Sequence, residues 1–184
     1  MRKHLYLFIF YFLIFNNGFA NNIENQLNKL FNELKLSKFD IKKSSKLEQK
    51  IWKFWVTHPN NKELTNMLNN GIILMNNQKF DEAILLLTKI IELDPNWAEA
   101  WNKRATVLYM IGEFEKSQND IDRVLELENR HFGALAGQGL VNIQLKNYEK
   151  AKLSYQKAQK IYPAMQSPKI MLKKIDELIK KESI

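Results

Sequence analysis

The sequence predicts an all-α fold, a solenoid of three stacked helix pairs. Three consecutive segments of 34 residues carry this prediction, at 64–97, 98–131 and 132–165. A period of this length is typical of helix–turn–helix units that stack side by side. Apolar residues make up 45% of the 184-residue chain, which has only 6 Gly and 4 Pro, so long helices and a core can form.

Residues 1–20 have the pattern of a secretory signal peptide. Arg2 and Lys3 precede an unbroken apolar run at 5–15, and Gly18 and Ala20 put small residues at −3 and −1 of a cut after Ala20. The run is shorter than the ~20 residues that span a bilayer as a helix. We expect an exported chain, periplasmic or secreted, with no stable membrane insertion after cleavage. An uncleaved anchor is the alternative.

Residues 21–63 form two expected helices that precede the repeats. The first carries one apolar stripe, formed by Ile23, Leu27, Leu30, Phe31 and Leu34. The second runs from 41 or 42 to about 57 and places Trp52 and Trp55 on one face, before a loop at Pro59. We expect an N-terminal helical cap that covers the apolar edge of the first repeat, with both tryptophans packed against it.

Within the repeats, small and large residues alternate in register. The eighth position of each copy holds Gly71, Ala105 and Gly139, and the fourth holds Met67, Trp101 and Leu135. Small residues allow two helices to approach closely, and large residues fill the layers between them. Pro95 and Pro163 close the first and third copies, where a helix has to stop.

The second copy carries a family resemblance. Its stretch AEAWNKRATVLYMIGEFEKS (98–117) places Trp101, Ala105, Gly112 and Phe114 in the pattern of the tetratricopeptide repeat, which it resembles. WNKRAT (101–106) and HFGALAG (131–137) also look like an exported alphaproteobacterial family of such proteins with no assigned activity. The resemblance implies a right-handed superhelix whose first helix per repeat lines the concave face. It implies helices at 64–77, 80–93, 98–111, 114–127, 132–145 and 148–161.

The tail, residues 166–184, reads as a C-terminal capping helix. Ser167 suits an N-cap and Pro168 a first helical residue. Leu172, Ile175, Leu178 and Ile179 give this helix one apolar face, with lysines opposite. A polar outer face is usual for the last element of a solenoid.

By resemblance, a partner peptide binds the concave face. The candidate partner-binding residues are Asn69, Ile72, Asn102, Lys103, Thr106, Tyr109, Met110, Gly133, Gly137 and Leu140. Some members of the family hold a peptide carboxylate in a clamp of lysines, an arginine and asparagines. Here only Asn69, Lys103 and Asn102 could serve, so the clamp is incomplete. The mixed groove suits apolar anchors of a peptide together with amide hydrogen bonds to its backbone.

Glycines leave a bare helical surface at 133–139. It is not a phosphate loop, because GALAGQG lacks a preceding strand and the Lys-Ser/Thr pair. One interpretation is close packing of the first helix of copy three against copy two. The other is a pocket for a ligand side chain beside Tyr109 and Met110.

Three residues of the second copy are expected to be structural: Trp101, Arg104 and Asp120. Arg104 points between the helices, by its register, and a buried arginine needs a hydrogen-bonded acid. We expect it to pair with Asp120.

Several function classes are excluded by composition. The chain has no Cys, which removes disulfides, thiol catalysis and thiolate metal sites. The net charge of +8 alternates along helices, so we expect no nucleic-acid partner. We find no nucleophile–base constellation, metal-ligand pair or cofactor fingerprint. The sequence therefore predicts a non-enzymatic scaffold or adaptor of the cell envelope, without cofactor or metal, that binds another protein or peptide. The alternative is a self-associating assembly or regulatory module, a homodimer formed through its terminal helices.

Overall fold

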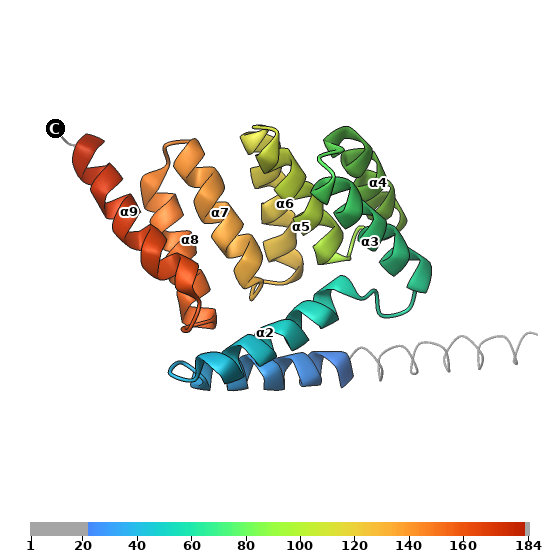
Figure 1. Ribbon diagram of the computed structural model, residues 1–184, viewed down its shortest axis with the longest axis horizontal. Helices are drawn as coiled ribbons and strands as arrows, with labels where there is room; N and C mark the ends of the chain where they lie inside the picture. Colours follow the sequence, from blue (N-terminus) through green and yellow to red (C-terminus); the bar gives the residue numbers. More distant parts are fainter. Residues whose placement is uncertain (1–21, 183–184) are drawn as a thin grey trace, which may run out of the picture.

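The computed structural model describes residues 22–182, which form helices joined by short turns (Figure 1). Three helix pairs stack side by side, and α9 (Gln166–Glu182) packs on the last of them. The pairs are α3 (Lys62–Asn76) with α4 (Phe80–Leu93), α5 (Ala98–Met110) with α6 (Phe114–Leu127), and α7 (Phe132–Gln144) with α8 (Tyr148–Ile161). The predicted all-α solenoid is confirmed, and α4, α6 and α8 begin and end at the predicted residues.

In all three helix pairs, the turn that joins the two helices has the same backbone conformation. Its central residue is left-handed in every copy: Gln78 at φ 59°, Gly112 at φ 83° and Lys146 at φ 58°. Glycine adopts this conformation freely, whereas for other L-residues it is sterically strained and costs free energy. The packing of each helix pair therefore imposes the turn, even where the sequence does not supply glycine.

The first repeat presents a polar face where the other repeats bury theirs. Val107 and Val141 are buried against the preceding repeat, whereas Ile73, at the same position of the first copy, is 55% exposed. The neighbouring positions on this face are exposed amides, namely Asn66, Asn70 and Asn77. This end of the stack is solvated and does not require a covering element.

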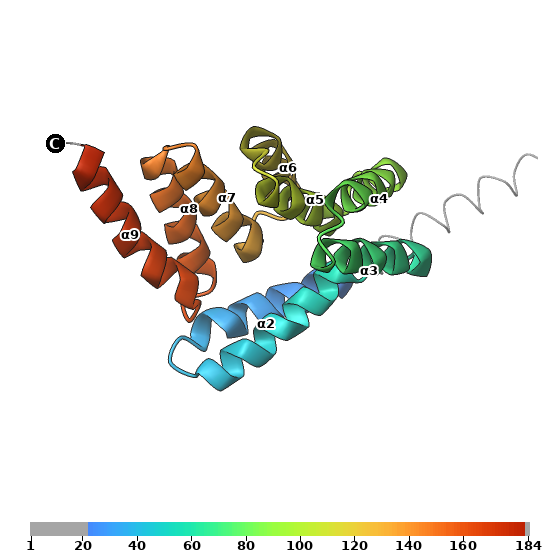
Figure 2. The ribbon, with the colours of Figure 1, turned by 45° about the horizontal axis from the view of Figure 1, so that its top comes forward.

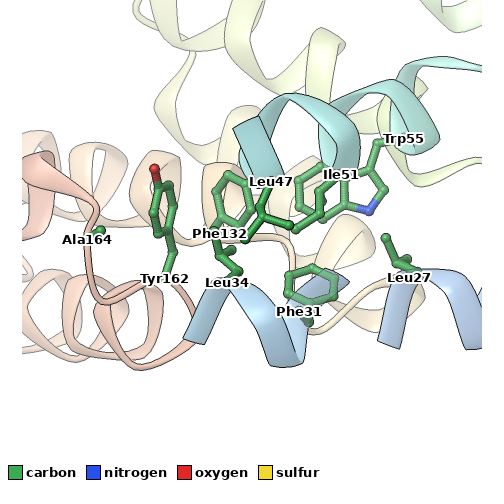
Figure 3. Packing of buried hydrophobic residues seen from close by; sticks show 9 residues of the cluster. All are labelled: Leu27, Phe31, Leu34, Leu47, Ile51, Trp55, Phe132, Tyr162 and Ala164. Atoms are coloured by element: carbon green, nitrogen blue, oxygen red, sulfur yellow. The ribbon is translucent and has the colours of Figure 1, made fainter. Parts of the chain in front are cut away.

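The N-terminal helices do not cap the first repeat, contrary to the sequence prediction. Residues 22–36 are helical and form a hairpin with α2 (Ile41–Val56) that crosses the stack at one edge (Figures 1 and 2). Its apolar stripes pack instead on the third repeat and the turn after it (Figure 3). This core contains Leu27, Phe31, Leu34, Leu47, Ile51, Trp55, Phe132, Tyr162 and Ala164. The physical reason is that the third repeat offers an apolar surface here, whereas the leading face of the first repeat is polar.

The two tryptophans face the interior of the chain. Trp52 and Trp55 pack on Phe132 at the start of α7, with ring centroids 5.8 Å and 5.0 Å away. The first repeat is contacted only near the end of α2: the Trp97 Nε1–H donates to the Trp55 carbonyl at 2.9 Å, and His58, just beyond the helix, lies with its Nε2 2.8 Å from Asp94 Oδ2. The prediction that both tryptophans pack on the first repeat is therefore wrong. Trp55 is buried by these contacts, whereas Trp52 is only partly buried.

The end of the chain differs slightly from the prediction. Helix α9 begins at Gln166, so Ser167 lies within its first turn and is not the N-cap. Ile175 is fully buried and packs in one cluster with Tyr155 of α8. Within residues 22–182, no helix is long and apolar enough to cross a membrane. The predicted signal peptide, residues 1–20, lies outside the described residues.

Candidate functional site

A buried polar cluster lies where α5 and α7 begin. Glu99 is fully buried, and its carboxylate is 2.8 Å from Lys103 Nζ and 3.0 Å from His131 Nε2. Asn102 Nδ2 donates to the same carboxylate at 3.1 Å. His131 also caps α7, because its Nδ1 accepts from the Ala134 amide at 3.0 Å. With Nδ1 accepting, the ring proton is on Nε2 and points at Glu99.

The charge state of Glu99 follows from these partners. Burial by itself raises the pKa of a carboxyl, because a charge in the interior loses its hydration. Here the hydrogen bond from His131 and the ammonium of Lys103 outweigh burial, and the pKa of Glu99 is lowered below the ordinary value of 4.5. Glu99 is therefore an ionised internal carboxylate at neutral pH.

The helix hairpin covers this cluster. Trp55 stacks on His131, and Trp52 lies edge-on to the same ring at 5.4 Å. Lys103 Nζ lies 5.2 Å from the centre of the Trp52 ring, a cation–π distance. Two predicted partner-binding residues, Asn102 and Lys103, thus hold the chain's own carboxylate. Glu99 thus engages two of the three residues of the incomplete clamp.

Beyond the hairpin, a groove remains open between α5 and α7, with a volume of about 230 Å³. Its lining contains six of the predicted partner-binding residues: Asn102, Thr106, Tyr109, Gly133, Gly137 and Leu140. The rest of the lining is mostly small or apolar: Ala105, Ser117, Ile121, Ala134, Ala136 and Val141. We refer to this space as the α5–α7 groove. Its shape fits an apolar side chain, and the Asn102 amide and Tyr109 hydroxyl are its polar edges.

The three glycines of α7 have three different neighbours. A Cβ on Gly133 would lie 2.8 Å from the Trp52 ring, and one on Gly139 would lie 2.4 Å from the Tyr155 ring. A Cβ on Gly137 would meet only the Ile121 Cδ1 at 3.7 Å, an ordinary contact. Close packing against copy two is therefore the wrong interpretation for Gly133 and Gly139, which make room for α2 and α8. Only Gly137 leaves free space, and this space belongs to the α5–α7 groove.

The structure does not bring the remaining predicted residues together. Asn69 and Ile72 lie on α3 in the first repeat and do not line the groove. Met110 is exposed at the end of α5, outside the lining, and Lys103 is turned toward Glu99. Six of the ten predicted partner-binding residues thus share one hollow between the second and third repeats, and the other four lie outside its lining.

The predicted Arg104–Asp120 pair is present and bidentate. Arg104 Nε and Nη2 donate to the two carboxylate oxygens of Asp120, both at 2.8 Å. Arg104 Nη1 also donates to Thr88 Oγ1 of the first repeat at 3.0 Å, and the guanidinium lies over the Trp101 ring. The pair ties α4, α5 and α6 together, which agrees with the structural role expected for Trp101, Arg104 and Asp120.

Sequence reasoning missed Glu99, His131 and the occupation of part of the concave face by Trp52. One signal was readable, because His131 directly precedes the third copy, at an N-cap position. Nothing in the repeat pattern pointed to Trp52, which belongs to an element outside the period. Among residues 22–182, no group of three or more His, Asp or Glu side chains is placed to hold a metal ion.

A larger hollow of about 760 Å³ lies between the two hairpin helices. Its walls include Ile23, Leu30, Phe54 and Pro59, with Lys29, Lys50 and Lys53 at its rim. None of the predicted partner-binding residues lies here.

Comparison with known proteins adds relatives by sequence. Residues 67–96 and 133–165 match the family model of the tetratricopeptide repeat. A TPR repeat-containing protein of Rhizobium etli is 32% identical over 146 residues, which covers 79% of this chain and 70% of the relative. Hsp70-Hsp90 organizing protein 3 of Arabidopsis thaliana is 27% identical over 89 residues, which is 48% of this chain but 16% of that longer protein.

Solved structures add relatives by fold. The first TPR of Spaghetti (RPAP3), bound to the HSP90 peptide SRMEEVD, superimposes with a TM-score of 0.63 at 22% identity. The match covers 65% of this chain and 95% of that one. The Sgt2 TPR domain of Aspergillus fumigatus gives a TM-score of 0.64 at 20% identity, over 67% of this chain and 83% of that one. At these identities, the likeness concerns the fold.

Proposed function

Because this chain belongs to the tetratricopeptide repeat proteins, we propose that it is a non-enzymatic interaction adaptor that binds a peptide segment of another protein in the α5–α7 groove. The observation that carries the proposal is the free space at Gly137 in a hollow of about 230 Å³. This volume is below the ~300–1,000 Å³ typical of sites for drug-sized ligands and suits a side chain of a peptide. The peptide-bound RPAP3 domain supports the proposal, since the same fold there holds a peptide.

The chemistry of the groove favours an apolar anchor over a terminal carboxylate. Lys103 and Asn102 already contact Glu99, so a second carboxylate placed there would meet a like charge. The groove farther along α5 is lined by Thr106, Tyr109 and Leu140. We therefore propose that a large apolar side chain of the partner enters between α5 and α7, while the Asn102 amide or the Tyr109 hydroxyl contacts its backbone.

We place this adaptor in the bacterial cell envelope, periplasmic or secreted. The support is the signal-peptide pattern of residues 1–20. Fractionation of a tagged full-length chain tests this location. A chain recovered from the cytosol with residues 1–20 intact would contradict it.

The binding proposal is tested with a displayed library of random peptides. Peptides selected on the wild type should share a large apolar residue, and Gly137→Leu should abolish their binding because its side chain fills the groove. The matched control is Gly137→Ala, which adds one methyl at ordinary contact distance and should retain most of the binding. Gly137→Leu should unfold at wild-type urea concentrations, and Gly137→Ala at the same or slightly higher ones. Selected peptides that bind Gly137→Leu as tightly as the wild type would show that the groove is not their site.

Self-association through α9 remains the alternative mode of action. Light scattering on the full chain separates a monomeric adaptor from a homodimer. A dimer that Ile170→Ser dissociates would favour the alternative, because Ile170 is an exposed apolar residue of α9.

A further inference from the structure

The turn of the N-terminal hairpin displays three large apolar side chains to solvent. Leu36 is 83% exposed, Phe39 91% and Ile41 63%, and all three lie within six residues of sequence. Figures 1 and 2 show this turn at one end of the hairpin, at the end of the stack where α8 and α9 lie. We call residues 36–43 the hairpin tip.

The tip is an ordered turn. Ser37 Oγ donates to the Leu34 carbonyl at 2.8 Å, and Asp40 Oδ1 caps α2 by accepting from the Lys43 amide at 2.8 Å. Ser44 is fully buried, and its Oγ donates to the Asp40 carbonyl at 2.9 Å. The polar side chains of the turn thus form hydrogen bonds within it, while its large apolar side chains are exposed to solvent. Exposing a cluster of large apolar side chains to water is unfavourable, and such clusters commonly mark interaction sites.

Lysines surround these apolar side chains. Between residues 35 and 46 the chain has five lysines and one acid, Asp40, which is occupied as the cap of α2. The lysines are Lys35, Lys38, Lys42, Lys43 and Lys46, and all are exposed. Lys38 Nζ lies 5.2 Å from the centre of the Phe39 ring, so cation and apolar surface adjoin directly.

We propose that the hairpin tip docks the protein peripherally on an anionic phospholipid bilayer. Leu36, Phe39 and Ile41 would enter the interface below the headgroups, and the lysines would contact lipid phosphates and carboxylates. The composition favours a bilayer over a protein partner, because the buried centre of protein interfaces is depleted in lysine. This inference does not depend on the α5–α7 groove.

Vesicle co-sedimentation of the full-length chain tests the proposal. Phosphatidylcholine vesicles with 30% phosphatidylserine should bind the chain, and pure phosphatidylcholine vesicles should bind it much less. Phe39→Ser should weaken binding at least about tenfold, because it removes the aromatic side chain that would be buried in the bilayer. Lys42→Gln with Lys43→Gln should weaken it by about fivefold per lysine, since each is worth about 1 kcal/mol near an anionic surface. Raising the salt concentration should also reduce binding.

Matched controls separate the tip from general surface effects. Leu85 on α4 is 72% exposed, so Leu85→Ser removes a comparable apolar side chain elsewhere. Lys89→Gln with Lys157→Gln removes two exposed lysines from α4 and α8. Both controls should bind vesicles like the wild type. Residues 1–20 are present in every variant, so any lipid binding by them is common to all and cannot produce the predicted differences.

A site-specific label gives a direct readout. The chain has no Cys, so Phe39→Cys carries a single environment-sensitive fluorophore at the tip and Leu85→Cys carries one at the control site. On anionic vesicles the emission at position 39 should shift to the blue, and the emission at position 85 should not. An unshifted label at 39, or tip variants that sediment like the controls, would overturn the proposal. A concentration-dependent shift without vesicles would overturn it in favour of a second copy of the chain.

Discussion

Trp55 of α2 lies face to face on His131, with ring centroids 3.9 Å apart and ring planes 10° apart. This contact joins an element that precedes the repeats to the N-cap residue of α7, the first helix of the third repeat. The edges of the same imidazole contact the Glu99 carboxylate and the Ala134 amide. One side chain thus caps α7, donates a hydrogen bond to a buried carboxylate and packs on the hairpin.

Removal of this stacking partner should destabilise the whole chain. We expect Trp55→Ala to lower the free energy of unfolding by about 3–5 kcal/mol, because a buried aromatic side chain is deleted from the core. Urea denaturation followed by circular dichroism measures the change. Leu85→Ala, at an exposed apolar position, should stay within about 0.5 kcal/mol of the wild type. Equal losses in the two variants would mean that the hairpin contributes nothing through Trp55.

Glu99 should make stability depend on acid. Its pKa is lowered by folding, so the ionised carboxylate stabilises the native state above about pH 4.5, and this contribution is lost as the pH falls below that value. Glu99→Gln should cost about 1.5–3 kcal/mol at pH 7, where a charged hydrogen-bond partner is lost. The variant should then lose less stability than the wild type between pH 5 and 3.

Urea titrations at pH 7, 5, 4 and 3 check the Glu99 prediction. The exposed Glu115→Gln serves as control and should follow the wild-type pH profile. If Glu99→Gln and the wild type decline in parallel, the cluster does not carry the acid dependence.

The Arg104–Asp120 pair should show strong coupling. Removing one partner leaves a largely buried charge unpaired, so we expect Arg104→Met and Asp120→Asn each to cost about 3 kcal/mol. The double variant should cost clearly less than the sum of the two. Arg104→Lys should not restore stability, because an ammonium cannot donate two parallel hydrogen bonds. A double-mutant cycle in urea provides the measurement, and additive losses would argue against the pairing.

Two neighbouring glycines of α7 should respond with opposite signs. Gly139→Ala forces a methyl into the Tyr155 ring and should lower the free energy of unfolding by about 1–3 kcal/mol. Gly137→Ala meets free space and should raise it by up to about 1 kcal/mol, because alanine favours the helix. Thermal and urea unfolding of both variants measure these changes in the free energy of unfolding. A loss of stability in Gly137→Ala would show that the α5–α7 groove is packed shut.

Much of the fold could be read from local pattern. The 34-residue period set the spacing of the repeats, and the resemblance to the tetratricopeptide repeat placed six helices within two residues of their observed ends. The register within one copy also predicted that Arg104 meets Asp120, since the two residues lie on paired helices. The polar leading face of the first repeat was not predicted, although Asn66 stands where the next two copies bury Ala100 and Ala134.

The site was only partly readable for the same reason. Resemblance identified the concave positions, and six of the ten residues do line the α5–α7 groove. The other four depend on what else occupies the concave face, and this is settled by contacts between distant segments. Lys103 is the clearest case, since Glu99 and Trp52 engage it inside the chain.

The sequence by itself determined the repeat architecture, because its period and its residue sizes act between neighbours along the chain. Only the tertiary structure decided where the N-terminal hairpin lies, which glycine is free, and how much of the groove stays open. These depend on whether Trp52 and Trp55 find a matching surface on α7, and no periodic pattern encodes a contact between a unique element and a repeat. The burial of two aromatic rings over His131 selects that arrangement.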